Sequence, residues 1–369
     1  FRMLMHPGTS VIPAAFAAAE ECGASGKDYI TALAAGYEVM ERLAADFIPT
    51  LMSRGFHASP VFGIFGAAVA AGKMFGLNED QMNSAIALCA SMAGGNLEGP
   101  RSGGRALREG VATRNALFAV ALARQGHVGG ETVLEGEAGF YHAYIGNNQG
   151  RLTYSFTGDT RANLDNITAG LGESWIFLET LYRIYSTSGY NIGHIAVTAQ
   201  LCTEHSIKPD QIERIEAVVN WLETQYPSPA FPNRREDKIH MPGSTAYHLA
   251  FAAIQRGFPM LRDWVPQSIS ADDPPEVLEL MKRVTIIPSH TTGLFAPRIT
   301  IFTRDGKSYT RQGTGQEFIW NYEEQARRVR DLVPGLPLSA ERFETIIQTC
   351  RALDGQARAD ALIGLTMSA

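Results

Sequence analysis

The sequence predicts a mainly α-helical protein built from two modules, and three observations support that prediction. The chain has 369 residues, more than one ordinary core accommodates, so we expect two domains. From Val11 to Gly126 nearly every segment has the hydrophobic period of an α-helix. Beyond Trp175, helical segments are interspersed with short segments that alternate as strands do. We therefore expect a large helical domain and a smaller α+β domain.

Five helices are expected in the N-terminal part, separated by Gly, Asn or Ser. Ser59 and Pro60 are expected to cap and open the third helix, and Asn78 to cap the fourth. In the third helix, small residues such as Gly63 and Gly66 recur at steps of three and four, which indicates a flat face packed closely against another helix. The expected helices span residues 11–22, 27–48, 59–76, 78–95 and 104–126.

The second module is expected to contain helices and strands in mixed order. A strand is predicted from Ile212 to Val219, and two further strands are joined as a hairpin at Asp305-Gly306. The segment "RVTIIPS" is a further strand, and "MPGSTAYHLAFAAIQRG" a helix. The last segments return to helix, so we expect the C-terminus to rejoin the first module. The predicted boundaries are 1–181 for the helical domain, 182–327 for the α+β domain and 328–369 for the returning helices.

Composition excludes several functional classes. The formal net charge is −6 and the isoelectric point is near 5.9, so nucleic-acid binding is not expected. The longest apolar runs are shorter than the roughly 20 residues that cross a membrane. The four cysteines lie far apart, and we expect reduced core residues of a cytoplasmic protein. No zinc, P-loop, dinucleotide or triad motif is present, so a mechanism without metal or cofactor is expected.

A few polar residues stand at predicted helix starts in apolar surroundings. His6 precedes the first helix and His57 the third, while Arg101, Arg105 and Arg108 lie at the start of the fifth. Histidine titrates near neutrality and the arginine guanidinium binds carboxylates with two hydrogen bonds. The set suits proton transfer on an anionic carboxylic acid. The alternative is that the histidines cap or pack helices and the arginines form a solvated face.

Several stretches in order resemble the MmgE/PrpD family, which includes 2-methylcitrate dehydratase, cis-aconitate decarboxylase and iminodisuccinate epimerase. They are "HPGTSVIPAAFAAAE", "RGFHASPVFGIFGAAVAAGKMFGLNEDQM", "GGRALREGVATRNALFAVALARQGHVGGETVLEGEAGF" and "EDKIHMP". The resemblance implies a cofactor-free homodimer that acts on a small carboxylate. It also implies a helical domain made from both ends of the chain and a smaller α+β lid, with the active site between them.

The resemblance assigns roles to residues near the helix starts. His6 matches the histidine of the family's "HP" motif and His57 that of "GFH", which are regarded as active-site residues. Arg105 and Arg108 stand where the family has a lysine and a histidine, so a carboxylate-binding role is expected for both. The family also has an aspartate-rich segment before the "HP" motif. We expect roughly the first quarter of a full-length member to be absent from this sequence.

Further positions match less closely. Arg183 stands at the family's lysine, and His194 at its later histidine if two extra residues are allowed. Lys238 matches another lysine, and these three residues are expected to bind substrate. Gly243 stands where the family has a tyrosine, and Tyr247, one helical turn further on, is the expected catalytic substitute.

The expected function is that of a lyase, a dehydratase or decarboxylase of a small di- or tricarboxylate. Such a reaction makes a carbanion next to a carboxylate, while a histidine moves the proton and cations stabilise the developing charge. An epimerase or isomerase of similar substrates is the first alternative, because the positions at Arg105, Arg108 and Gly243 have changed. A catalytically silent, dimeric carboxylate-binding protein is the second.

Overall fold

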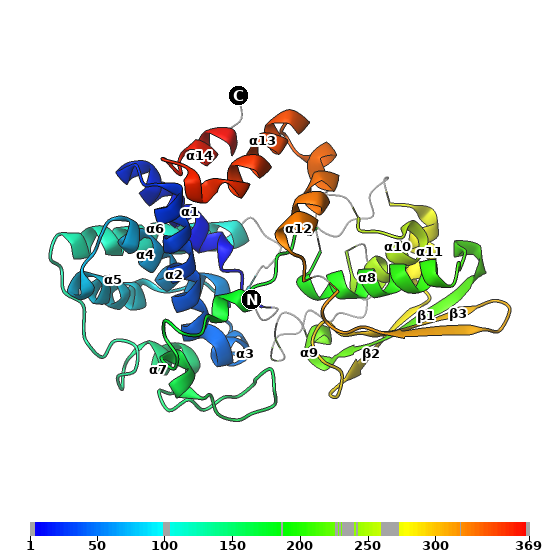
Figure 1. Cartoon of the computed structure of the whole chain (residues 1–369). Coiled ribbons are helices and arrows are strands. Elements are labelled where there is room, and N and C mark those ends of the chain that lie inside the picture. The colour runs from blue at the N-terminus through cyan, green and yellow to red at the C-terminus, as the bar shows by residue number, and fades with distance from the viewer. Residues whose placement is uncertain are drawn as a thin grey trace. The chain divides into compact units, whose positions relative to one another are not determined.

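The structure is a computed structural model, and it divides the chain into two compact units (Figure 1). The first unit comprises Phe1–Thr180 and Ala340–Ala369, and the second Leu181–Ser339. The structure describes residues 4–98, 104–185, 187–225, 228, 230, 240, 243–259, 273–317 and 319–366, with the backbone alone at 104–106 and 335. Helices dominate, which confirms the expected mainly α class, and the described strands form one sheet.

The first unit is a helical layer built around α4, Ala58–Met74. Every residue from Ala58 to Gly72 is buried, and α4 packs against α1, α2 and α6. The unit contains α1 (Gly8–Cys22), α2 (Gly26–Ala44), α3 (Ile48–Ser53), α4, α5 (Glu79–Met92), α6 (Gly104–Arg124), α7 (Phe140–Ile145), α13 (Ala340–Arg351) and α14 (Ala361–Thr366).

The small residues of α4 allow a close approach of α1 and α2, as the sequence predicts. A Cβ added at Gly66 would lie 2.7 Å from the backbone oxygen of Gly36 on α2. One added at Gly63 would lie 2.6 Å from the Ser10 hydroxyl on α1. Real Cβ atoms do not approach this closely, so the glycines set the spacing of the three helices.

Of two expected helix caps, the one at Asn78 is confirmed and the one at Ser59 is not. Asn78 caps α5 as predicted, because its side chain accepts the Gln81 backbone N–H at 2.9 Å and the Gln81 side chain accepts the Asn78 N–H at 3.2 Å. The prediction that Ser59 caps α4 was wrong. The helix begins at Ala58 with His57 at its N-cap position, and the Ser59 hydroxyl accepts the backbone N–H of His6 at 3.0 Å instead. Ser59 lies in the first turn and faces the start of α1, so a tertiary partner replaces the local one.

The C-terminal residues complete the first unit. The Gly26 N–H donates to the Gln356 carbonyl at 2.9 Å, and the Ala359 N–H donates to the Ala24 carbonyl at 2.9 Å. A Cβ at Gly26 would lie 1.7 Å from the Leu353 carbonyl oxygen, so the two chain segments meet at backbone distance. Residues 340–366 therefore pack as part of the helical layer.

The return to the first unit lies at Ala340, later than the expected position 328. The reason is that α12, Tyr322–Val329, packs within the second unit. The Arg328 guanidinium lies 4.4 Å from the centre of the Trp320 ring, and its Nη1 is 3.5 Å from the Tyr185 hydroxyl.

The second unit contains a four-stranded mixed sheet in the order β2-β1-β3-β4. Strand β1 is parallel to β2 and antiparallel to β3, and β3 is antiparallel to β4. The predicted strands and the hairpin turn at Asp305-Gly306 are confirmed. The elements are α8 (Gly189–Glu204), β1 (Ile212–Asn220), α9 (Trp221–Thr224), α10 (Thr245–Gln255), α11 (Pro275–Met281), β2 (Val284–Ser289), β3 (Arg298–Thr303), β4 (Ser308–Gln312) and α12.

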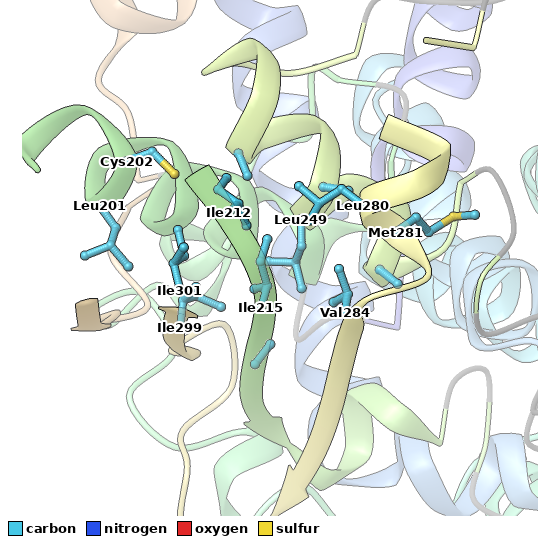
Figure 2. Close-up of a cluster of buried hydrophobic side chains, with 14 of the residues drawn as sticks. Leu201, Cys202, Ile212, Ile215, Leu249, Leu280, Met281, Val284, Ile299 and Ile301 are labelled. Carbon is cyan, nitrogen blue, oxygen red and sulfur yellow. The ribbon is translucent and has the colours of Figure 1, made fainter. Parts of the chain in front are cut away.

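One face of this sheet forms a hydrophobic core with the helices α8, α10 and α11 (Figure 2). Alternate residues of the strands point into it, including Ile215 of β1 and Ile299 of β3, and they meet Leu249 of α10 and Leu280 of α11. Period-two burial along β1 is what the sequence alternation predicts.

The cysteines are all free thiols, but their places differ from the expectation. Cys89 and Cys202 are buried, whereas Cys22 and Cys350 are exposed. The expectation that all four lie in the core was wrong for the last two, because Cys22 ends α1 and Cys350 lies near the end of α13, where side chains reach the surface.

Candidate functional site

The two histidines singled out in the sequence lie together at the N-terminal end of α4. The ring centroids of His6 and His57 are 6.4 Å apart, and the ring planes differ by 19°. His6 comes from the residues before α1, and His57 occupies the N-cap position of α4. The His57 side chain makes no capping hydrogen bond to α4, so helix capping does not account for the residue type.

The backbone at His57 is fixed by a neighbouring extended segment. The His57 N–H donates to the Gly95 carbonyl at 3.0 Å, and the Leu97 N–H donates to the Gly55 carbonyl at 2.7 Å. Gly95 has a φ of +125°, and a Cβ there would lie 2.7 Å from Cγ of Pro60. Glycine is therefore required at position 95, and the segment holds His57 in one position.

A carboxylate faces His57 from the neighbouring helix. Oε1 of Glu109 on α6 lies 3.5 Å from Nδ1 of His57, and both side chains are almost completely buried. The sequence interpretation did not single out Glu109. A signal was present, because Glu109 precedes Ala112, Ala116 and Ala119 on the face of α6 that is buried. An acidic residue on such a face needs a partner.

His6 is held by the first turn of α4. Its Nδ1 lies 3.1 Å from the Ser59 hydroxyl, whose oxygen also accepts the His6 backbone N–H. In a neutral imidazole the hydroxyl can donate its single proton to Nδ1, which places the ring proton on Nε2. Ser59 thus orients the ring of His6 beside His57.

The predicted arginines near this site have different places in the structure. The Arg108 guanidinium donates to the Asn96 carbonyl and lies 3.4 Å from the Glu98 carbonyl, so it holds the segment that fixes His57. Substrate binding by Arg108 stays a prediction. Arg105 lies in α6, but its side chain is outside the described residues, as is all of Arg101.

The other predicted residues belong to the second unit. Arg183 is exposed on the segment before α8, and Lys238 lies outside the described residues. Gly243 has a φ of +82°, a conformation that L side chains rarely adopt, so a tyrosine at this position would be strained. Substrate binding by Arg183 and Lys238 stays a prediction.

His194 is fully buried within the second unit and contacts protein groups through both ring nitrogens. Nδ1 lies 2.5 Å from the Tyr190 carbonyl, and Nε2 lies 3.2 Å from Oε2 of Glu223. A carbonyl only accepts, so Nδ1 carries a proton. The other Glu223 oxygen accepts the Phe295 N–H at 2.7 Å. Glu223 therefore links His194 to the loop before β3. Substrate binding by His194 stays a prediction.

Tyr247 is buried in the hydrophobic core of the second unit. Its hydroxyl donates to Oδ1 of Asp273 at 2.7 Å, and its ring packs against the side chains around α10. This arrangement supports a structural contact, and the catalytic role expected for Tyr247 stays a prediction.

The first unit contains a second buried polar cluster, at the C-terminal end of α2. Glu38 pairs with Arg42, whose guanidinium donates to carbonyls of the segment 166–174. The Thr180 hydroxyl donates to Oε1 of Glu41 at 2.6 Å. Burial raises the pKa of the Glu41 carboxyl to about 7, although the Thr180 hydrogen bond acts in the opposite direction.

Among the residues that the structure describes, no group of three or more His, Cys, Asp or Glu side chains is placed to hold a metal ion. Within the same residues, no helix has the length and apolar character needed to cross a membrane.

Comparison with known proteins relates the chain to one family. Residues 2–153 match the sequence model of the MmgE/PrpD N-terminal domain, and this match includes His6, His57 and Glu109. The chain is 26% identical to the cis-aconitate decarboxylase-like protein oryM of Aspergillus oryzae over 324 residues, 82% of this chain and 64% of that protein. It is 27% identical to the cis-aconitate decarboxylase of Aspergillus terreus over 328 residues, 83% of this chain and 64% of that enzyme.

A mammalian relative matches over more of the chain. The cis-aconitate decarboxylase of Mus musculus is 26% identical over 378 residues, 94% of this chain and 72% of that enzyme. The chain spans just under two thirds of the length of the two Aspergillus relatives. The matched N-terminal domain and these relatives agree with the motifs around His6 and His57, and they support a relationship of the chain to the MmgE/PrpD family.

Proposed function

We propose that this protein is a lyase that decarboxylates a small unsaturated tricarboxylate of the cis-aconitate type. The observation that carries the proposal is the pair of imidazoles, His57 and His6, held 6.4 Å apart at the start of α4 with Glu109 against His57. Three relatives with 26–27% identity are named for cis-aconitate decarboxylation, which supports the choice of reaction.

The chemistry needs a group that moves one proton near neutral pH. When the bond to the departing carboxylate breaks, its electron pair stays on the substrate carbon, and a proton must reach the carbon skeleton. Histidine is the side chain whose ordinary titration range suits this role. His57 and His6 are the proposed acid and base, and a metal or cofactor is not part of the proposal.

Cationic side chains are proposed to bind the substrate carboxylates. A guanidinium binds a carboxylate through two hydrogen bonds and stays charged at all relevant pH values. The candidates are Arg105, Arg108, Arg183 and Lys238, with His194 as a further one. The second unit is proposed to act as a lid that carries some of these groups, with Tyr247 as its candidate catalytic residue.

A homodimer is proposed as the working form. The exposed face of α6 carries Leu107 and Phe118, which are 66% and 55% exposed, and a second copy of the chain would cover them. Light scattering during size-exclusion chromatography is expected to give twice the chain mass. A single chain mass would contradict this part of the proposal. A cytoplasmic location is also part of the proposal.

The function is tested by proton NMR of cis-aconitate, citrate, 2-methylcitrate and iminodisuccinate incubated with the protein in deuterated water. Loss of carbon dioxide from cis-aconitate is the expected result. Conversion of citrate or 2-methylcitrate to an alkene would show that the reaction is dehydration and not decarboxylation. Deuterium incorporation without a change in connectivity would show that it is epimerisation. No change in any of the four acids, with a protein that is folded, would overturn the proposal.

The role of His57 is tested with a matched pair of variants. His57→Ala is expected to abolish turnover in a protein that stays folded and keeps its oligomeric state, with a melting temperature lowered by the loss of the buried contact with Glu109. His142→Ala changes an exposed histidine of the same unit and is expected to leave turnover intact. Retained turnover in His57→Ala, or loss of folding in place of loss of turnover, would assign His57 a structural role.

A further inference from the structure

Glu109 and His57 form a buried pair of an acid and an imidazole within the first unit. The 3.5 Å between Oε1 and Nδ1 is longer than an ordinary N–H···O hydrogen bond, so their interaction in this structure is electrostatic. Both side chains are withdrawn from water, with 6% and 10% of their side-chain surface exposed, and an interaction between charges is weakened little by solvent there.

The geometry points to Glu109 as the residue that positions His57 and keeps its imidazole protonated, so that His57 acts as the general acid of the reaction. The inference rests on the proposed function for the identity of the reaction. It rests on the geometry of the His57–Glu109 pair for the claim that His57 carries the proton that is transferred. Because Nδ1 faces Glu109, the transferred proton is assigned to Nε2. Glu109 does not touch the substrate in this scheme and is a positioning residue.

The step balances in atoms and charge. The carbon–carbon bond to one substrate carboxylate breaks, carbon dioxide leaves, and the electron pair remains on the substrate. The Nε2 proton of His57 then forms the new C–H bond, and the imidazole becomes neutral. A proton from water restores the imidazolium before the next turnover. A carboxylate beside the ring favours this charged starting form.

Other charged and titratable groups lie around this end of α4. His6 faces His57 from the residues before α1, and a charge on its ring would oppose one on His57. Arg108, next to Glu109 on α6, bonds the Asn96 carbonyl and also opposes a positive His57. Both groups are unchanged in a Glu109 variant, so comparison with the wild type isolates the contribution of Glu109.

The decisive experiment follows the titration of His57 directly. Imidazole nitrogen signals of labelled protein are recorded as a function of pH, and the His57 signal is assigned by its loss in His57→Gln. In Glu109→Gln, which keeps the shape of the side chain but removes its charge, the His57 midpoint is expected to fall by about one pH unit. The control Glu20→Gln makes the same change on the exposed face of α1 and is expected to leave the midpoint unchanged. An unchanged or higher midpoint in Glu109→Gln would overturn the inference.

The pH profile of kcat/KM for cis-aconitate gives a second readout. A general acid loses activity as the pH rises through its titration. In Glu109→Gln the pH at which kcat/KM falls on the alkaline side is therefore expected to be lower by the same interval of about one pH unit. At a pH above this fall, kcat/KM of the variant is expected to be about tenfold below that of the wild type. A uniform loss without movement of this fall would show a merely structural role and overturn the inference.

The two proposals fail in distinguishable ways. A wild-type protein that is folded but inactive on all four acids refutes the proposed function. The NMR titration then still decides whether Glu109 keeps the His57 imidazole protonated. If Glu109→Gln does not fold, the wild-type titration decides: the His57 midpoint is expected to lie above the ordinary histidine value of about 6.5, and a midpoint below that value overturns the inference.

Discussion

Replacement of Gly66 by alanine tests the packing that places His57 at the end of α4. The new Cβ would lie 2.7 Å from the Gly36 oxygen, 2.8 Å from Cβ of Met40 and 2.9 Å from Cγ2 of Val11. Two of these atoms belong to the backbone or to a Cβ of α2, so they cannot move without moving that helix. Overpacking of a core costs about 1–3 kcal/mol, and we take the upper value because the atoms are fixed. Alanine regains about 1 kcal/mol of helix propensity.

The expected net result is a loss of about 2 kcal/mol in the free energy of unfolding. It is measured by urea unfolding, followed by helical circular dichroism, with the slope of the transition compared between variants. Gly364→Ala is the control, since a Cβ at this position in α14 meets no atom within 4 Å. It is expected to cost nothing and to gain up to about 1 kcal/mol. A Gly66→Ala variant as stable as the wild type would refute the argument that glycine sets the helix spacing.

Substitutions at three further positions test other contacts. Burial raises the Glu41 pKa above its usual 4.5 to about 7, so the folded state binds this proton more tightly and the associated stability is lost as the pH rises from about 5 to 8. Glu41→Gln is expected to remove that part of the pH dependence, on the order of 3 kcal/mol, as measured by urea unfolding at several pH values. Asn78→Ala is expected to lose about 1 kcal/mol with the cap to Gln81, whereas Asn78→Asp retains it; equal melting temperatures for both would contradict the capping assignment. Tyr247→Phe removes a partner of the buried Asp273 and is expected to cost about 1–3 kcal/mol in the free energy of unfolding; loss of turnover in the folded variant would support the proposed catalytic role, and retained turnover would contradict it.

The sequence allowed local features to be predicted and left the tertiary pairs unresolved. The Asn78 cap and the Asp305-Gly306 hairpin depend on a few neighbouring residues, and both were predicted. Ser59 is a residue type that commonly caps helices, but its hydroxyl binds His6. This hydrogen-bond partner depends on how α1 packs beside α4. The partnership of Glu109 with His57 likewise requires the packing of α6 on α4, and no spacing in the sequence encodes it.

The contacts of Gly26 and Ala24 with Leu353, Gln356 and Ala359 have a consequence for synthesis of the protein. The helices of the first unit leave the ribosome well before the residues that finish their packing, because the roughly 160 residues of the second unit are translated in between. At about 5–20 residues per second this delay is on the order of ten seconds or more. During that interval the nascent α1 and α2 expose the surface that the last helices later cover, which makes this edge a place for a chaperone to bind.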